Sequence, residues 1–110
     1  MAAATSLVAS LNTTANSGTY TTSAWTPGNP RHISAVFACT GTIASGANAT
    51  AADSAGALTW SKVDEQINIG GSGDSSYTFE AYCNSSPGSI TVALTLTGDN
   101  GTGCNASVYE

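Results

Sequence analysis

Nine residues, SITVALTLT at Ser89–Thr97, form the most regular stretch of this sequence. Four apolar residues, Ile90, Val92, Leu94 and Leu96, alternate in it with small and polar ones. Because successive side chains of a β-strand point to opposite faces, this alternation predicts a strand with an apolar inner face and a threonine-rich outer face. The stretch therefore indicates a β protein in which a sheet covers a core with one of its sides.

The residues before this stretch predict a second strand at 76–83, SYTFEAYC. One of its faces carries Tyr77, Phe79, Ala81 and Cys83. The link between the two strands contains Pro87-Gly88, which suits the central positions of a type II turn. We therefore expect the two strands to pair as a hairpin.

The C-terminal residues predict a third strand, in which Cys104, Ala106 and Val108 occupy alternate positions. The segment before it, GDNGTG, contains Asn100-Gly101, which can supply the positive φ angles of a tight reversal. We therefore expect this strand to run antiparallel beside the strand at 89–97.

The N-terminal half contains three further strand patterns. SLVASL at 6–11 alternates, TYTTSAW at 19–25 is a weaker strand that ends at Trp25, and HISAVFA at 32–38 has apolar residues on both faces. Two apolar faces are typical of a strand in the middle of a sheet, so 32–38 is expected to be central. Residues 39–56 are rich in Ala but also contain Asn, Thr, Asp and Gly, which favour a short strand and a loop over a helix.

Together these patterns predict an all-β fold, an antiparallel β-sandwich of about seven or eight strands, either immunoglobulin-like or jelly-roll. The length of 110 residues fits one domain, 1–110, in which residues 1–5 form a flexible N-terminal arm.

Small side chains dominate the composition. Ala, Ser, Thr and Gly supply 61 residues, whereas Leu, Ile, Val and Phe supply 17. A disordered chain would also carry high charge, and only 9 residues here are charged, so a folded β protein is the better explanation. Because a thin core leaves a small domain with little stability of its own, we expect the chain to form a homo-oligomer.

The charge of the chain argues against several classes of partner. The formal net charge is −5, and Arg31 and Lys62 are the two basic residues, so no basic patch is available for nucleic acid. The sequence shows no long apolar run and no basic amphipathic stretch for a membrane, and its start lacks the pattern of a signal peptide. We expect a soluble protein made in a reducing cytoplasm, without a secretion signal of its own.

The three cysteines, Cys39, Cys83 and Cys104, are widely spaced and contain no C-x-x-C motif, which argues against a zinc site. In a reducing cytoplasm we expect three buried free thiols, and a Cys83–Cys104 bridge is the alternative.

The stretch GALTWSKVD at 56–64 gathers a tryptophan, a lysine and an acid. Leu58 and Trp60 share a face, which predicts that Trp60 belongs to the core. The later apolar residues, Val63, Ile67 and Ile69, have the opposite parity, so we expect the inward face to switch there. The charged residues Lys62, Asp64 and Glu65 then fall at a strand end or bulge, where they solvate the rim and discourage edge pairing.

The sequence carries no catalytic, cofactor-binding or metal-binding pattern. Asp64 and Glu65 are adjacent and point to opposite sides of an extended chain, which does not suit an acid–base pair. His32 is the single histidine, expected in a strand with an ordinary hydrogen bond, and no G-x-S-x-G motif accompanies it. GDNGTG lacks the spaced acids of a calcium loop. A small hydrolase is a third possible function only because scattered Ser, His and Asp residues are present.

The loop WTPGNPR at 25–31 suggests a contact surface. Trp and Arg are enriched at interface hot spots, and two prolines restrict the loop. The candidate partner-contact residues are Ala2, Ala3, Ala4, Trp25, Pro27 and Arg31, the alanines because the arm can order on a neighbouring subunit. The alternative is a rigid strand connector in which Trp25 caps the core.

The order of SLVASLN, PRHISAVFA, DSAGALTWSKV, PGSITVALTLTG and CNASVYE resembles small β-sandwich proteins of tailed bacteriophages, particularly capsid decoration (cement) proteins. The resemblance spans nearly the whole chain. It implies a virion protein on the capsid surface, often trimeric, that clamps neighbouring subunits of the major capsid protein. The alternative function is a carbohydrate- or host-recognition sandwich of a phage tail, fibre or bacterial adhesin, in which Trp25, Trp60 and the tyrosines stack on sugar rings.

Overall fold

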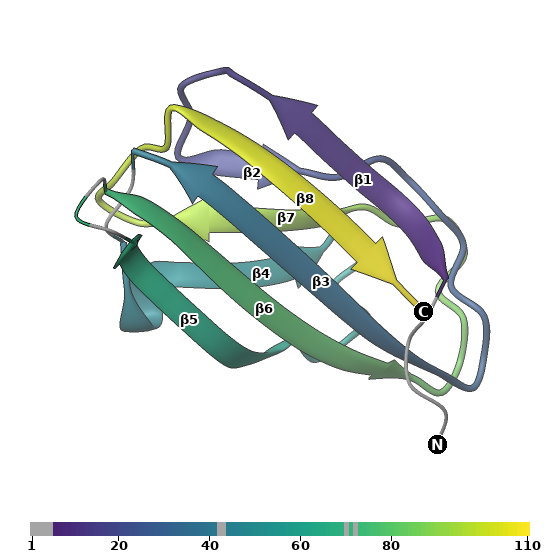
Figure 1. The fold of residues 1–110 in the computed structure, drawn as a ribbon. Coiled ribbons are helices and arrows are strands. Elements are labelled where there is room, and N and C mark those ends of the chain that lie inside the picture. The colour runs from purple at the N-terminus through teal and green to yellow at the C-terminus, as the bar shows by residue number, and fades with distance from the viewer. Residues whose placement is uncertain (1–5, 42–43, 70, 72) are drawn as a thin grey trace.

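The computed structural model describes residues 6–41, 44–69, 71 and 73–110, which form two antiparallel sheets packed as a β-sandwich (Figure 1). The five-stranded sheet has the order β1 (Leu7–Thr13), β8 (Gly103–Tyr109), β3 (Arg31–Thr40), β6 (Asp74–Cys83) and β5 (Ser61–Ile69). The three-stranded sheet has the order β2 (Thr19–Thr21), β7 (Val92–Leu96) and β4 (Ala49–Asp53). The predicted fold class is confirmed.

The core lies between the two sheets and is built from the alternating faces that the sequence indicates. The small sheet contributes Ile90, Val92, Leu94 and Leu96, and β6 contributes Tyr77, Phe79, Ala81 and Cys83, all buried. Phe37 of β3 meets Phe79 edge-on, with ring centroids 6.3 Å apart and planes at 78°, an arrangement that aromatic pairs favour. Burial of each large apolar side chain contributes about 1.5–3 kcal/mol to the stability of the fold.

The last three strands pair differently from the prediction. β6 pairs with β3 and β5 in the large sheet, whereas β7 pairs with β2 and β4 in the small one. β8 returns to the large sheet between β1 and β3. The predicted hairpin and the predicted pairing of β8 beside β7 are therefore both wrong, because the chain crosses between the sheets at each connection. Alternation specifies which face of a strand is buried, but not which neighbour completes its ladder.

The connections from β6 to β7 and from β7 to β8 explain the positions of several glycines. Gly88 has a φ of 84°, as the second central position of a type II turn requires. In the later turn the positive φ falls on Gly98, at 78°, and not on Asn100 or Gly101 as predicted. Gly101 serves close packing instead, since a Cβ there would lie 2.7 Å from the hydroxyl of buried Tyr20.

The predictions for the N-terminal half are largely confirmed. β3 lies in the middle of the five-stranded sheet, as its two apolar faces indicated. The weak strand at 19–25 consists of β2 and an isolated bridge between Trp25 and Ile90. The short strand expected within 39–56 is β4, which follows a 3-10 turn at Gly46–Asn48.

The three cysteines are buried and free, as predicted. Cys83 lies opposite Arg31 at the start of β3, whereas Cys104 lies opposite Cys39 near its end. At about 3.3 Å per residue, nearly the whole length of the strand separates these two positions. The alternative Cys83–Cys104 bridge is therefore wrong for this fold.

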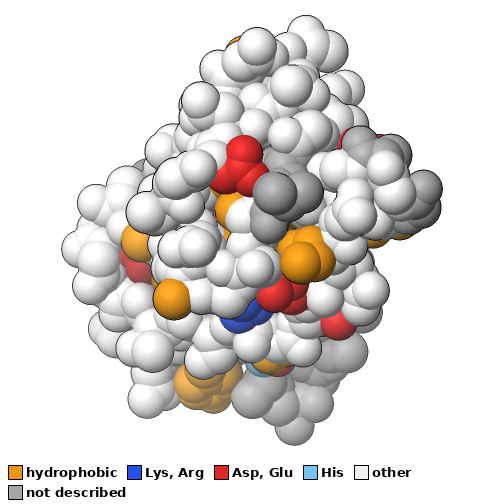
Figure 2. All heavy atoms as spheres, turned by 90° about the vertical axis from the view of Figure 1, so that its left-hand side faces the viewer, with side chains coloured by type: hydrophobic (Ala, Val, Ile, Leu, Met, Phe, Trp, Pro, Cys, Tyr) orange, Lys and Arg blue, Asp and Glu red, His pale blue; other side chains and the backbone are white. Residues whose placement is uncertain are grey.

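One end of the molecule carries few charged groups. Figure 2, which faces the left-hand end of the view in Figure 1, shows a mainly uncharged polar surface with scattered hydrophobic groups and a few charged ones. In the part of the chain that the structure describes, no helix has the length and apolar character to cross a membrane.

Candidate functional site

Strand β5 forms an edge of the five-stranded sheet and exposes three large apolar side chains. Val63 is 52% exposed, Ile67 43% and Ile69 49%. The parity of the sequence predicted that these three residues face inward, and that prediction is wrong. We call Val63, Ile67 and Ile69 the β5 apolar strip.

The ladder between β5 and β6 is irregular at two places near these residues. The register between β5 and β6 shifts between Lys62 and Asp64 and again between Gln66 and Ile69. Asn68, inside the second irregularity, has a left-handed φ of 53°. A bulge sets two residues opposite one and so reverses which side chains face the core. The predicted bulge is confirmed, but the residues opposite the core-facing Phe79 and Tyr77 are Lys62 and Glu65, and Val63 is left exposed.

Lys62 and Glu65 brace the edge of the sandwich. Lys62 Nζ lies 2.7 Å from Glu65 Oε1, and it also donates to the carbonyls of Gly46 and of Ala49, the latter at 3.2 Å. Glu65 accepts a hydrogen bond from the Gly46 N–H at 3.0 Å. The hydrogen bond from Lys62 holds the pKa of Glu65 below its ordinary value. The two residues therefore tie β5 to the turn before β4 in the opposite sheet, whereas Asp64 alone faces solvent as predicted.

Asp53, at the end of β4, orders the loop that leads to β5. Its Oδ1 accepts from the N–H groups of Ala55 and Ala57, at 3.1 and 3.0 Å. Its Oδ2 accepts from the Leu58 N–H at 3.0 Å and from the Trp60 Nε1–H at 3.1 Å. Burial by itself would raise the pKa of Asp53, but these four hydrogen bonds outweigh it and the pKa is lowered. The carboxylate is thus a structural acceptor that is fully occupied by its own chain.

Trp60 is half-buried and packs against the core beside Leu58, so the prediction that it is buried is correct only in part. Its indole nitrogen is held by Asp53, which fixes the ring against the protein.

The loop at 25–31 is the rigid connector that the sequence analysis weighed as the alternative. Trp25 is only 8% exposed and Pro27 is fully buried. Glu110 accepts hydrogen bonds from Trp25 Nε1 at 3.1 Å and from the Gly28 N–H at 3.0 Å. The Asn29-Pro30 peptide bond is cis. The side chains of Trp25 and Pro27 therefore belong to the core, and the expectation of an exposed loop is wrong for both.

Among the other predicted contact residues, Arg31 keeps an exposed side chain, with its Nε 3.9 Å from Glu110 Oε1. Ala2, Ala3, Ala4 and the remainder of the predicted arm 1–5 lie outside the described residues.

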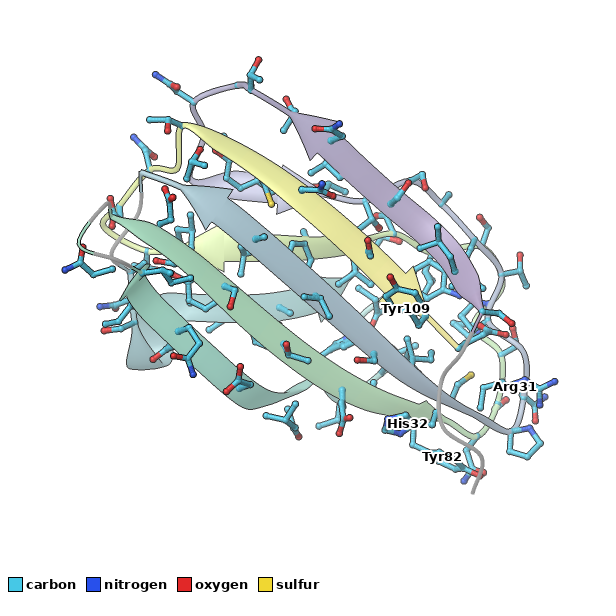
Figure 3. The ribbon with its side chains drawn as sticks, viewed as in Figure 1. Arg31, His32, Tyr82 and Tyr109 are labelled. Atoms are coloured by element: carbon cyan, nitrogen blue, oxygen red, sulfur yellow. The ribbon has the colours of Figure 1, made fainter. Side chains whose placement is uncertain are left out.

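A second candidate surface lies on the outer face of the large sheet (Figure 3). His32 lies opposite Tyr82 in the β3–β6 ladder, and His32 Nε2 is 3.1 Å from Glu80 Oε1, which confirms the ordinary hydrogen bond expected for this histidine. Tyr82 is 46% exposed. These three residues line a hollow of about 490 Å³ together with Leu58 and Val63.

Sequence reasoning missed the residues that shape both surfaces. In the sequence, Asp53 lies in the Ala-rich segment 39–56 and nothing marks it as a site residue. The one signal for its role is its position two residues before Ala55, which is the spacing of an Asx turn. Tyr82 was placed correctly on the face opposite Phe79, but nothing in the local pattern showed that this face stays uncovered.

Comparisons with protein-family models, with curated proteins and with solved structures find no match to this chain. Among the described residues, no group of three or more His, Cys, Asp or Glu side chains is placed to hold a metal ion.

Proposed function

We propose that this chain is a non-enzymatic structural protein of a phage virion, a capsid decoration protein that binds the outer surface of the head as a homotrimer. The β5 apolar strip is the observation that carries the proposal. Large apolar groups that gather on a surface are typical of protein contact sites. In a chain with 17 Leu, Ile, Val and Phe residues, three of them on one exposed edge strand are a large share.

Hydrogen bonds of Lys62 and Glu65 hold the strand that carries the β5 apolar strip. Lys62 and Glu65 fix β5 to the turn at Gly46–Asn48, so the strip is presented on an ordered strand and not on a loose edge. A surface that is ordered before binding loses less conformational entropy when it docks. This arrangement favours a long-lived contact with a neighbouring subunit.

The geometry favours contact through side chains over strand addition. The two register shifts and the left-handed Asn68 interrupt the ladder of β5, and such irregularities discourage pairing with the edge of another sheet. A neighbouring subunit would therefore cover the strip by packing against it.

The trimer and the capsid partner follow from the resemblance and from avidity. Three modest contacts made together by a symmetric trimer hold a capsid more firmly than one contact does. In this proposal Arg31 and the arm containing Ala2, Ala3 and Ala4 contact the major capsid protein.

The experiment mixes the protein with heads of the phage that encodes it, purified without it, and measures co-sedimentation and the temperature at which the heads rupture. We expect the parent to bind and to raise that temperature, and Ile67→Asp to do neither. Leu7→Asp is the matched control, because Leu7 is 60% exposed on β1 at the opposite edge of the sheet. Failure of the parent to bind, or equal loss in both variants, would contradict the proposal.

The second candidate function is a carbohydrate- or host-recognition module, and the hollow beside Tyr82 favours it. An exposed tyrosine ring next to a carboxylate and an imidazole can stack on a sugar ring and hydrogen-bond its hydroxyls. Trp25 is not available for such stacking because it is buried. Binding of the parent to a glycan array that is lost in Tyr82→Ala, without binding to heads, would select this function.

A further inference from the structure

Cys39 and Cys104 form a buried thiol pair in the large sheet. Their Sγ atoms lie 3.5 Å apart, and the two residues are direct partners in the β3–β8 ladder. Residues opposite each other in an antiparallel ladder have Cα atoms about 4.5–5.5 Å apart. A disulfide spans Cα separations of about 4.4–6.8 Å. The Cα separation expected for paired residues therefore falls within the range that a disulfide spans.

We propose that Cys39 and Cys104 form a thiol–disulfide modification site that small-molecule disulfides oxidise to a cross-strand bridge between β3 and β8. The proposal does not rest on the capsid function, because the two thiols belong to β3 and β8 and their contact does not involve the β5 apolar strip.

A hollow lies beside the pair, and Ile69 of the β5 apolar strip is part of its lining. Its volume is about 370 Å³, and its lining includes both cysteines together with Thr13, Thr40 and Asn105. Pockets for small molecules begin at roughly 300 Å³, so a low-molecular-weight disulfide is of a suitable size. Because both thiols are buried, we expect slow oxidation limited by access.

The proposed thiol–disulfide exchange has two steps, and its atoms and electrons balance. The Cys39 sulfur attacks one sulfur of the reagent disulfide, forming a mixed disulfide and releasing one reagent thiol. The Cys104 sulfur then attacks Cys39 of the mixed disulfide and releases the second reagent thiol. Two cysteine thiols are oxidised to one disulfide, and the reagent disulfide takes up two electrons and two protons as two thiols.

The hydrogen bond between the two thiols favours Cys39 as the first nucleophile in the exchange. The hydrogen bond from Cys104 lowers the pKa of Cys39, whereas the same contact, with burial, raises the pKa of Cys104. The thiolate is the attacking species in such exchange, so the thiol with the lower pKa is the better first nucleophile.

Cys83 provides an internal control. It is buried as well, but it lies opposite Arg31 at the other end of β3, and burial raises the pKa of its thiol. We expect it to stay reduced while the other two react.

The test incubates the reduced native protein with excess oxidised glutathione, blocks remaining thiols with an alkylating agent, and measures the intact mass and the linked peptides. We expect one bridge between Cys39 and Cys104, one alkylated thiol at Cys83, and a rise in the unfolding temperature, because a bridge between residues 65 positions apart restricts the unfolded chain. Cys83→Ser should form the same bridge, and Cys39→Ser should form none.

Three outcomes would overturn the proposal. The native parent could keep three alkylatable thiols under conditions that oxidise the urea-unfolded chain, it could form a bridge that includes Cys83, or it could stop at a stable glutathione adduct.

Discussion

Single carboxylates order the two loops that flank the core. Asp53 gathers four hydrogen bonds from residues 55–60, and Glu110 holds Trp25 and Gly28 from the far end of the chain. A buried donor that loses its acceptor pays the full cost of desolvation. With so few large apolar residues, the fold depends on such polar contacts more than a domain with a thick core would.

Asp53→Ala should lower the free energy of unfolding by about 3 kcal/mol, because it leaves several donors without an acceptor. Urea denaturation followed by fluorescence of the half-buried Trp60 measures the change. The matched control is Asp64→Ala on the solvent side of β5, which should stay within about 0.5 kcal/mol of the parent. Equal losses in the two variants would show that the hydrogen bonds of Asp53 are not the cause.

The same carboxylate predicts a dependence on pH. The pKa of Asp53 in the folded protein lies below its ordinary value of 3.8, so its contribution is fully present above that value and is lost as the pH falls through the folded pKa. The gap in stability between the parent and Asp53→Asn should therefore be widest near neutral pH and should narrow below about pH 4. A gap that stays constant down to pH 2.5 would contradict this assignment.

At the level of elements, β5 shows how far sequence reasoning reaches. The change in parity after Ser61 predicted a bulge, and the register shift at Lys62/Asp64 confirms it. The prediction that the apolar residues fill the inner face was wrong, because hydrophobicity alone favours burial of Val63 over Lys62. In the structure Lys62 and Glu65 take the inner positions instead, because they pair with each other and hydrogen-bond the backbone of Gly46. Gly46 lies 16 residues before Lys62, so the local sequence pattern does not reveal this partner.

Glu65→Ala should loosen the contact between β5 and the turn at Gly46–Asn48 without unfolding the sandwich. The Gly46 N–H then loses its acceptor, and its amide hydrogen exchange should accelerate by tenfold or more, while amides in β3 stay protected. Hydrogen exchange followed by NMR measures both, and Asp64→Ala serves as the neighbouring control. Unchanged exchange at Gly46 would show that the brace does not hold the turn.

At the level of the whole molecule, the sequence predicted the class of fold, the central place of β3 and the burial of the thiols, but not the assignment of β6, β7 and β8 to sheets. Alternation is a property of one strand, whereas pairing depends on where the chain crosses the core. The candidate surfaces were predictable only in part. The loop at 25–31 has a composition typical of an interface, but Glu110 and the core bury its tryptophan, and no local pattern reveals a partner 85 residues away.

The proposed assembly surface is the β5 apolar strip, since a thin core gains stability when neighbouring subunits cover exposed apolar groups. The Cys39–Cys104 pair lies on β3 and β8, and Ile69 of the strip lines the hollow beside it, so assembly through the strip should slow the oxidation of the pair.

The most direct test of this claim is the mass of the protein in solution, measured by light scattering over a range of concentrations. The parent and Leu7→Asp should show a mass three times that of the 10.9 kDa chain, whereas Ile67→Asp should show the mass of a single folded chain. A parent that stays at 10.9 kDa at every concentration, or an Ile67→Asp variant that assembles as the parent does, would contradict the account.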